Sequence, residues 1–254
     1  MSRTIVVTGA ASGIGAATVE RLKGTGQRVI GVDLRNADIE ADLGTQAGRA
    51  HMVAEVARLA PDGIDAVLAG AGISRGDMPR ETVAINYFGA VATLEGLRPL
   101  MARSSRPRAV VICSTAAFLP ATRKVVDLCL AGDEPAALEA MAAEPQSSYS
   151  TSKNALALWL RRTATKPEWA GAGILLNGVG PGVVTTPMTT PLLDQPDMVK
   201  LIDQSNPIAV EGYAQAEEIA ELIDFLLGME NHYLLGQLIF IDGGSDAIIR
   251  PEQV

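Results

Sequence analysis

Short apolar runs alternate with runs of helical periodicity along nearly the whole chain. The expected strands are residues 4–8, 28–33, a short one within 37–43, 64–72, 108–114, 173–182 and 236–244. The expected helices are residues 13–26, 46–60, 82–104 and a segment that begins near 147. Such alternation predicts a parallel sheet covered by helices on both faces. We therefore expect a single doubly wound α/β domain over residues 1–254, with a mostly seven-stranded parallel sheet.

Composition narrows the function classes. The 254 residues carry 21 basic and 29 acidic side chains, a net charge of −8, which argues against a nucleic-acid partner. No apolar run reaches the roughly 18 residues of a membrane span. The N-terminus, "MSRTIVVTG", lacks the charged, apolar and small-residue order of a signal peptide. Two cysteines make no disulfide framework. We expect a cytoplasmic protein without a membrane partner.

The turn after the first expected strand is rich in glycine. In "VTGAASGIGAATVE", Gly9, Gly13 and Gly15 lie between strand and helix. Glycine there permits a tight turn and close approach of the backbone to a pyrophosphate, while the helix N-terminus offers free N–H groups. Asp33 ends the next strand, 18 residues after Gly15, where an acidic residue is expected to bind the ribose hydroxyls. Together these features predict a Rossmann-type dinucleotide site.

Two charged residues bear on the choice of cofactor. The Asp33 carboxylate would repel the 2′-phosphate of NADP, whereas Arg35 could accept it. We weigh Asp33 more heavily because it ends the strand, so we expect NAD(H). Asp42 is compatible with a contact to the adenine and equally with a helix N-cap.

Oxidation of an alcohol with a nicotinamide requires a base for the hydroxyl proton. His51 and His232 both lie away from the expected strand ends. Tyr149 is the other candidate, in "SSYSTSK", and Lys153 follows it by one helical turn. A positive charge near the phenol favours the phenolate, so we expect Lys153 and the oxidised nicotinamide to lower the pKa of Tyr149.

These residues resemble the short-chain dehydrogenase/reductase family over nearly the whole chain. "TGAASGIG", "INYFGA", "VVICS", "YSTSK", "PGVVTTPM" and "IDGG" are each similar to a family motif. The resemblance implies that Tyr149 is the acid/base, that Lys153 also binds the nicotinamide ribose and that Ser114 orients the reacting oxygen. It also implies that Asn86 holds a water linking Lys153 to solvent. We assign no residue to a metal.

The resemblance and the glycine turn together define the cofactor contacts that we expect. They are Gly9, Ser12, Gly13, Ile14, Gly15, Asp33, Asp42, Leu43, Gly70, Ala71, Gly72, Tyr149, Lys153, Gly182, Val184 and Thr186.

Three departures from the family pattern narrow the subfamily. "AGAG" (69–72) stands where most members have Asn-Asn-Ala-Gly, and only 14 residues separate Gly72 from Asn86. Ser114 and Tyr149 are 35 residues apart, which leaves an insertion at 118–147 that reads as two short helices around "AGDEP". This combination is similar to the bacterial 3α-hydroxysteroid dehydrogenase/carbonyl reductases.

We therefore expect an NAD-dependent enzyme that interconverts secondary alcohols and ketones. The resemblance implies a small apolar substrate, a 3α-hydroxysteroid or 3-ketosteroid. Two alternatives remain: a reductase of aromatic ketones or quinones, and a protein that senses NAD without turnover. Residues 183–210 combine apolar residues with prolines, and we expect them to form a mobile lid that orders over an apolar ligand.

The insertion also bears on assembly. Many family members are tetramers in which the helix of Asn86 and the helix of Tyr149 pair across a two-fold axis. The insertion carries apolar residues at helical spacing that need a surface to cover, either those same helices or the rim of the substrate cleft. If it covers the helices, it blocks that pairing, and a dimer through residues 236–241 and 215–228 remains possible. We expect a homodimer.

Overall fold

The computed structural model describes residues 2–253 and confirms the predicted fold class, with a seven-stranded sheet in the order β3-β2-β1-β4-β5-β6-β9. All neighbouring strands run parallel, and Val6 of β1 lies opposite both Ile30 and Val67. The strand order reverses between β1 and β4, and the carboxyl ends of strands at such a point form the usual ligand crevice. The strands are β1 (Thr4–Thr8), β2 (Arg28–Asp33), β3 (Ile39–Glu40), β4 (Ala66–Ala69), β5 (Arg108–Ile112), β6 (Leu175–Pro181) and β9 (Leu238–Ile241).

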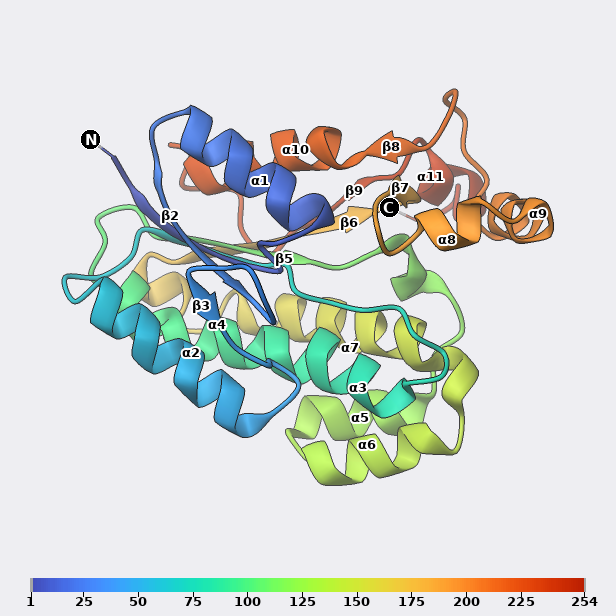
Figure 1. The fold of residues 1–254 in the computed structure, drawn as a ribbon, viewed down its shortest axis with the longest axis horizontal. Coiled ribbons are helices and arrows are strands. Elements are labelled where there is room, and N and C mark those ends of the chain that lie inside the picture. The colour runs from blue at the N-terminus through green and yellow to red at the C-terminus, as the bar shows by residue number, and fades with distance from the viewer. Residues whose placement is uncertain (1, 254) are drawn as a thin grey trace.

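Helices cover both faces of this sheet. One layer contains α1 (Gly13–Gly24) and α10 (Ala216–Gly228); the other contains α2 (Gln46–Leu59), α4 (Ala90–Met101) and α7 (Ser148–Thr163) (Figure 1). Successive strand residues point to opposite faces, so β1 contributes to two cores. Ile5 and Val7 are buried in the α1/α10 core, whereas Val6 is buried in the α2/α4/α7 core.

The long helix expected at 82–104 is divided into three parts. The chain forms α3 (Pro79–Val83), then a π-helical turn at Ala84–Gly89, and then α4. A π-turn inserts one extra residue per turn and is frequent at functional sites. Asn86 lies in this turn. The prediction of one regular α-helix over residues 82–104 is therefore wrong at the position of this candidate site residue.

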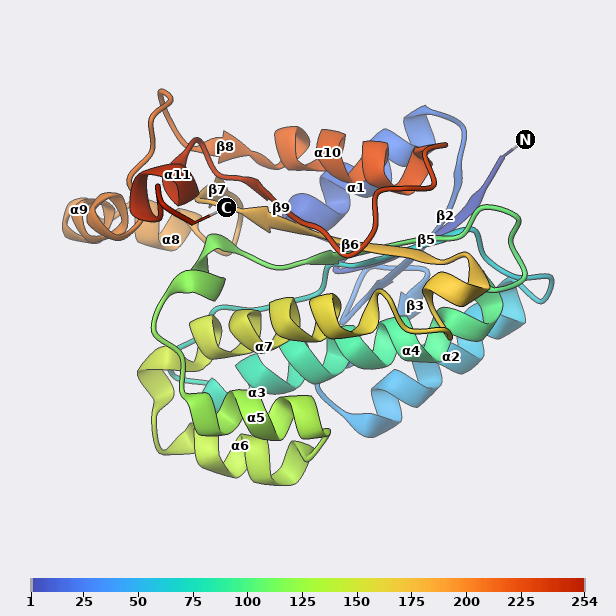
Figure 2. The same cartoon turned by 180° about the vertical axis from the view of Figure 1, so that it is seen from behind.

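The insertion forms the predicted helix pair. α5 (Arg123–Ala131) ends at Gly132, which has a φ of 77°, and α6 (Glu134–Ala142) begins after Asp133, whose side chain accepts a hydrogen bond from Ala136 N. Val125, Val126 and Met141 are buried. Figures 1 and 2 show both helices outside the α4/α7 layer, against α3 and α7. Of the two surfaces considered for the insertion, it therefore covers the helices.

The segment expected to be a lid contains two helices that were not predicted. They are α8 (Thr190–Leu193) and α9 (Pro196–Ser205), and neither has a buried residue. A short sheet of β7 (Val184–Thr185) and β8 (Ala214–Gln215) holds the base of the segment. These elements lie with α11 (Ser245–Ile249) at one end of the molecule (Figure 1). None of the helices between residues 2 and 253 is long and apolar enough to cross a membrane.

The remaining helical turns are of the 3-10 type, at Thr115–Phe118, Pro145–Ser147 and Ala170–Ala172.

Candidate active site

The turn between β1 and α1 is closed around its glycines. Gly9 and Gly13 have φ values of 76° and 52°, which L side chains rarely adopt. A Cβ on Gly15 would lie 1.9 Å from the carbonyl oxygen of Gly9, and one on Gly9 would lie 3.0 Å from Ala71 Cα. The backbones of the turn, of α1 and of the loop after β4 therefore meet without side chains between them. This cradle at the start of a helix fits a pyrophosphate.

Thr8 ties the loop after β4 to β1. Its Oγ1 accepts hydrogen bonds from Gly70 N at 3.0 Å and from Ala71 N at 3.2 Å. This role of Thr8 was not predictable, because a threonine at the end of a strand gives no signal of the loop that it will meet. It fixes the "AGAG" segment on which the cofactor is expected to lie.

Asp33 and Asp42 stand at the edge of the same space. Asp33 Oδ2 accepts a hydrogen bond from Ala11 N at 2.9 Å and Oδ1 accepts one from Leu34 N at 2.7 Å, so its carboxylate is fixed beside the glycine turn. Asp42 Oδ1 accepts a hydrogen bond from Gly44 N at 2.9 Å. The N-cap of α2 is Thr45, which accepts a hydrogen bond from Gly48 N. The alternative of an N-cap role for Asp42 is therefore wrong.

A cleft of about 350 Å³ gathers the predicted cofactor contacts. It is lined by Gly9, Ser12, Gly13, Ile14, Gly15, Asp33, Asp42, Leu43, Gly70, Ala71, Gly72, Ser114, Tyr149, Lys153, Gly182, Val184 and Thr186. The lining residues that sequence reasoning missed are Leu34, Ala41, Ile73, Ile85, Ile112 and Cys113, whereas Pro181, Pro187, Met188 and Thr189 lie in segments expected beside the nicotinamide or in the lid. Most of these adjoin a predicted contact, and only the tertiary structure turns them toward the cleft.

Ser114 and Tyr149 meet in this cleft although 35 residues separate them. Ser114 follows β5 and Tyr149 lies in the first turn of α7, and the Ser114 hydroxyl is near enough to lower the pKa of the Tyr149 phenol. Lys153 lies one turn further along α7. Its Nζ donates to the carbonyl oxygen of Ile112 at 2.8 Å and lies 5.7 Å from the centroid of the Tyr149 ring. Two hydroxyls and one ammonium thus face a single region of the cleft.

The pKa of Tyr149 differs from the prediction. The cleft raises the pKa of Tyr149, because desolvation of the phenolate outweighs the lowering effect of the Ser114 hydroxyl. Burial also lowers the pKa of Lys153 to about 8, so this lysine loses part of its charge just above neutral pH. In the protein alone, the expected lowering of the Tyr149 pKa by Lys153 is therefore wrong, since desolvation dominates.

Asn86 lies behind the cleft wall and does not line it. Its Oδ1 accepts from Ile73 N at 2.8 Å, and its Nδ2 donates to Ile73 O at 2.9 Å and to Ser152 Oγ at 3.1 Å. A Cβ on Gly72 would lie 3.0 Å from Asn86 Oδ1 and 3.8 Å from Lys153 Nζ. Asn86 therefore braces the strand-end loop beside Lys153, and the π-turn places it there.

The two histidines do not contribute to this site. His51 lies on the exposed side of α2, and His232 is exposed in the loop before β9. Among residues 2–253, no group of three or more His, Cys, Asp or Glu side chains could hold a metal ion.

Comparison with known proteins identifies the family. Residues 3–126 match the family described as short chain dehydrogenase, and residues 135–246 match the one described as enoyl-(acyl carrier protein) reductase. The chain is 34% identical to the 3-alpha-hydroxysteroid dehydrogenase/carbonyl reductase of Comamonas testosteroni, over 98% of each chain. It is 29% identical to the 2-(R)-hydroxypropyl-CoM dehydrogenase of Xanthobacter autotrophicus, over 98% of this chain and 100% of that one.

A solved structure agrees with these matches. The 3-alpha-hydroxysteroid dehydrogenase from Pseudomonas sp. B-0831, complexed with NADH, superposes with a TM-score of 0.92 at 37% identity, covering 99% of this chain and 100% of that one. Levodione reductase, at 24% identity and a TM-score of 0.75, shares the fold. The chain therefore belongs to the short-chain dehydrogenase family, as an oxidoreductase that uses NAD or NADP.

Proposed function

We propose that the protein is an NAD(H)-dependent oxidoreductase that interconverts 3α-hydroxysteroids and 3-ketosteroids. One observation carries the chemistry: Ser114, Tyr149 and Lys153 line the same cleft, with Lys153 Nζ 5.7 Å from the centroid of the Tyr149 ring. Two hydroxyls that line one region of a cleft can both bind one substrate oxygen. The names of the two steroid dehydrogenases with 34% and 37% identity support the substrate class.

The cleft fits a dinucleotide from end to end. The glycine turn and the start of α1 would take the pyrophosphate, Asp33 the ribose, and Asp42 and Leu43 the adenine end. Gly182, Val184 and Thr186, after β6, would take the nicotinamide end. When bound, the nicotinamide supplies or accepts the hydride. The fixed Asp33 carboxylate favours NAD, because a 2′-phosphate there would meet a negative charge.

The protein side chains handle the proton. In ketone reduction, Tyr149 donates its proton to the carbonyl oxygen, and its raised pKa keeps that proton available at neutral pH. In alcohol oxidation Tyr149 acts as the phenolate and becomes a neutral phenol when it accepts the proton, and the Lys153 ammonium stabilises that phenolate before the transfer. The Asn86 side chain bonds Ile73 and Ser152 and so acts on the loop beside Lys153, not on the reacting atoms.

The lid supports an apolar substrate. Pro187 and Met188 line the cleft, and Met188, Leu192 and Leu201 are exposed by 41%, 36% and 56%. Apolar side chains on helices without a buried residue gain from covering a ligand. Burial of about 250 Å² of apolar ligand at ~25 cal/mol/Å² contributes roughly 6 kcal/mol before association costs. A steroid offers such an area, and an acetone-sized ketone does not.

Tyr149→Phe tests the proposal, since it removes the ionisable oxygen and keeps the ring. Loss of a positioned proton donor is expected to lower kcat for steroid ketone reduction by about 10²- to 10⁴-fold. Calorimetry should show NADH binding close to that of the wild type. The NADH absorbance assay should run on a 3-ketosteroid, an aromatic ketone, a quinone and acetone. Wild-type protein that binds NADH but consumes none with any of them would contradict an enzymatic role.

For assembly we propose a homodimer. α5 and α6 pack against α3 and α7, and α7 is one of the two helices through which the family resemblance implies that tetramers form. All four residues of the edge strand β9 remain partly exposed, and Phe225 of α10 is 59% exposed. Light scattering should give a dimer for the wild type, and Phe225→Glu should shift it toward monomer. A tetrameric wild type would show that the insertion does not limit assembly.

A further inference from the structure

The loop from Asp42 to Thr45 joins β3 to α2 and forms one end of the cleft. Its own hydrogen bonds shape it: Thr45 N donates to Asp42 O at 3.1 Å, and Gly48 N donates to Thr45 Oγ1 at 3.0 Å. A Cβ on Gly48 would lie 2.0 Å from Asp42 O, so the start of α2 presses directly on the loop. Asp42 and Leu43 line the cleft. The position of this loop therefore sets the shape of the proposed adenine site.

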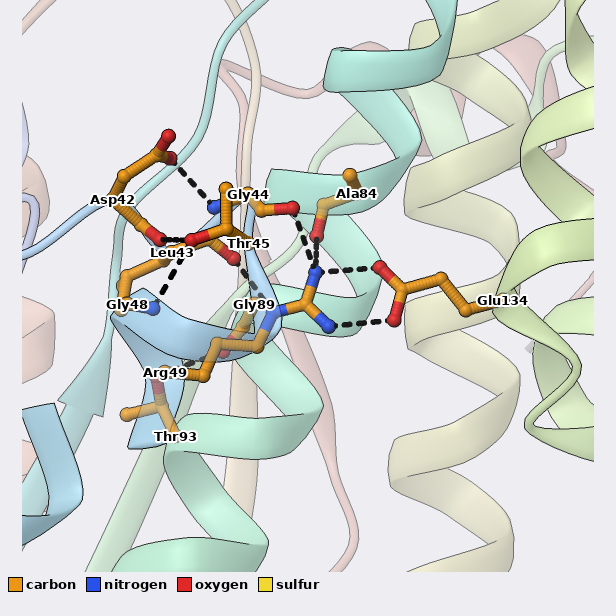
Figure 3. Close-up of polar contacts among 10 residues, drawn as sticks. All are labelled: Asp42, Leu43, Gly44, Thr45, Gly48, Arg49, Ala84, Gly89, Thr93 and Glu134. Atoms are coloured by element: carbon orange, nitrogen blue, oxygen red, sulfur yellow. Dashed lines mark hydrogen bonds and ion pairs between the residues drawn. The ribbon is translucent and has the colours of Figure 1, made fainter. Parts of the chain in front are cut away.

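Arg49 of α2 holds this loop from behind. Its Nε donates to Leu43 O at 2.7 Å, and its Nη2 donates to Gly44 O at 3.2 Å (Figure 3). The same Nη2 donates to Ala84 O at 3.1 Å, the first residue of the π-helical turn. One guanidinium thus joins the cofactor loop to the turn that carries Asn86. The fork of an arginine suits this role because its five N–H groups point in fixed directions.

Glu134 provides the charge that keeps Arg49 in place. Its two oxygens each accept a hydrogen bond of 2.7 Å, from Nη1 and Nη2, so the pair is bidentate (Figure 3). The side chains are 9% and 16% exposed. Glu134 is the first residue of α6, and therefore belongs to the insertion. A buried guanidinium without its counter-charge is costly, so loss of Glu134 would draw Arg49 toward water and away from the loop carbonyls.

We propose that the insertion serves the cofactor site: through Glu134 it holds Arg49 on the Leu43 and Gly44 carbonyls and so fixes the loop that takes the adenine end of the dinucleotide. The inference rests on the proposed function, because it needs the adenine to lie at this end of the cleft. Arg49 and Glu134 are positioning residues, since neither lines the cleft. The competing account is a staple that attaches the insertion to α2 and affects stability alone.

Glu134→Gln separates the two accounts. It keeps the side-chain length and one acceptor but removes the charge. Calorimetry well below the unfolding temperature should show NADH and ADP-ribose each binding about 3- to 30-fold more weakly, the range seen for residues that act through a network. The KM for NADH should rise by the same factor, with a smaller change in kcat. Inhibition by nicotinamide mononucleotide should stay the same, because that fragment lacks the adenine.

Asp127→Asn is the matched control. Asp127 lies on α5 of the same insertion and pairs with Arg123 at 2.7 Å, with its side chain 54% exposed. This variant also removes one acid from the insertion but touches no part of the loop, so its affinity for ADP-ribose should equal that of the wild type. Arg49→Lys is a second test. It keeps a positive charge opposite Glu134 but cannot reach the carbonyls of Leu43, Gly44 and Ala84 together, so it should also weaken the binding of ADP-ribose.

Three outcomes would overturn the proposal. If Glu134→Gln has a lower unfolding temperature but binds ADP-ribose with wild-type affinity, the Arg49–Glu134 pair serves stability alone. If Glu134→Gln does not fold, wild-type affinity for ADP-ribose in a folded Arg49→Lys variant would lead to the same conclusion. Wild-type protein that binds neither NADH nor ADP-ribose would instead refute the proposed function, and the inference with it.

Discussion

Two regions of the ligand cleft are built in different ways. At the glycine turn the backbone is so close-packed that one added carbon on Gly15 would lie 1.9 Å from Gly9 O. In the segment proposed as a lid, α8 and α9 bury no residue, and Leu201 is 56% exposed. The glycine turn is determined by contacts of the chain with itself. The lid segment buries little of itself, and we propose that a ligand supplies the missing contacts.

This difference implies a division of labour. A close-packed cofactor end binds without rearrangement, which spares the cost of ordering it. A lid with few buried contacts opens at little cost and belongs to the least stable part of a fold. We infer that the cofactor end is preformed, with the Arg49–Glu134 pair as one of its supports, and that the lid is completed by the substrate.

The largest effect should come from Gly15→Ala. The new methyl group must displace backbone on both sides, and a displacement of about 1 Å at a site can cost on the order of 100-fold. We expect at least about 100-fold weaker binding of NADH by calorimetry.

Gly24→Ala is the control for that prediction. Gly24 ends the same helix, and a Cβ there would meet no atom within 4 Å. Its NADH affinity should match the wild type, and its stability should rise by up to about 1 kcal/mol because alanine favours the helix. Full NADH affinity in Gly15→Ala would show that the cofactor end is more pliable than its packing indicates.

A smaller effect is expected from Asp33→Ala, which removes a negative charge but adds no atom to the close-packed glycine turn. Removal of the carboxylate should relax the preference for NADH over NADPH roughly ten-fold, from the repulsion of two charges a few ångströms apart. The exposed Arg35 should then help to bind the phosphate. Asp38→Asn is the control, since Asp38 bonds Gly31 N and does not line the cleft. A wild type that already prefers NADPH would mean that Arg35 outweighs Asp33.

The sequence predicts the sheet well because each strand has a local signature. Residues 28–33 form β2 as expected, since a parallel strand with a buried centre reads as a short apolar run between turns. The helix pair of the insertion was also predictable, because Gly132 and Asp133 are ordinary stop and start signals. The residues that line the cleft follow from strand ends, which the same alternation locates.

Features that depend on tertiary contacts were not predictable. Arg49 and Glu134 are 85 residues apart, and the sequence around either residue gives no sign that the other will contact it. The π-turn at Ala84–Gly89 has no residue signature that distinguishes it from an ordinary helical turn. The raised pKa of Tyr149 reflects desolvation, which the spacing to Lys153 does not reveal. The helix α9 was predictable in principle, because Met198, Leu201 and Ile202 recur at helical spacing, whereas α8, with four residues, is too short to show a period.

Hydrogen exchange across the whole chain tests the division of labour most directly. It should be measured for the protein alone, with NADH, and with NADH plus a steroid ketone in the Tyr149→Phe variant, which prevents turnover. We expect the amides of β1 and of α1 to be protected already in the protein alone. Those of residues 190–205 should exchange fast alone and with NADH, and become protected only when the steroid is added. A lid that is protected in the protein alone, or one that NADH protects fully without a steroid, would contradict the account.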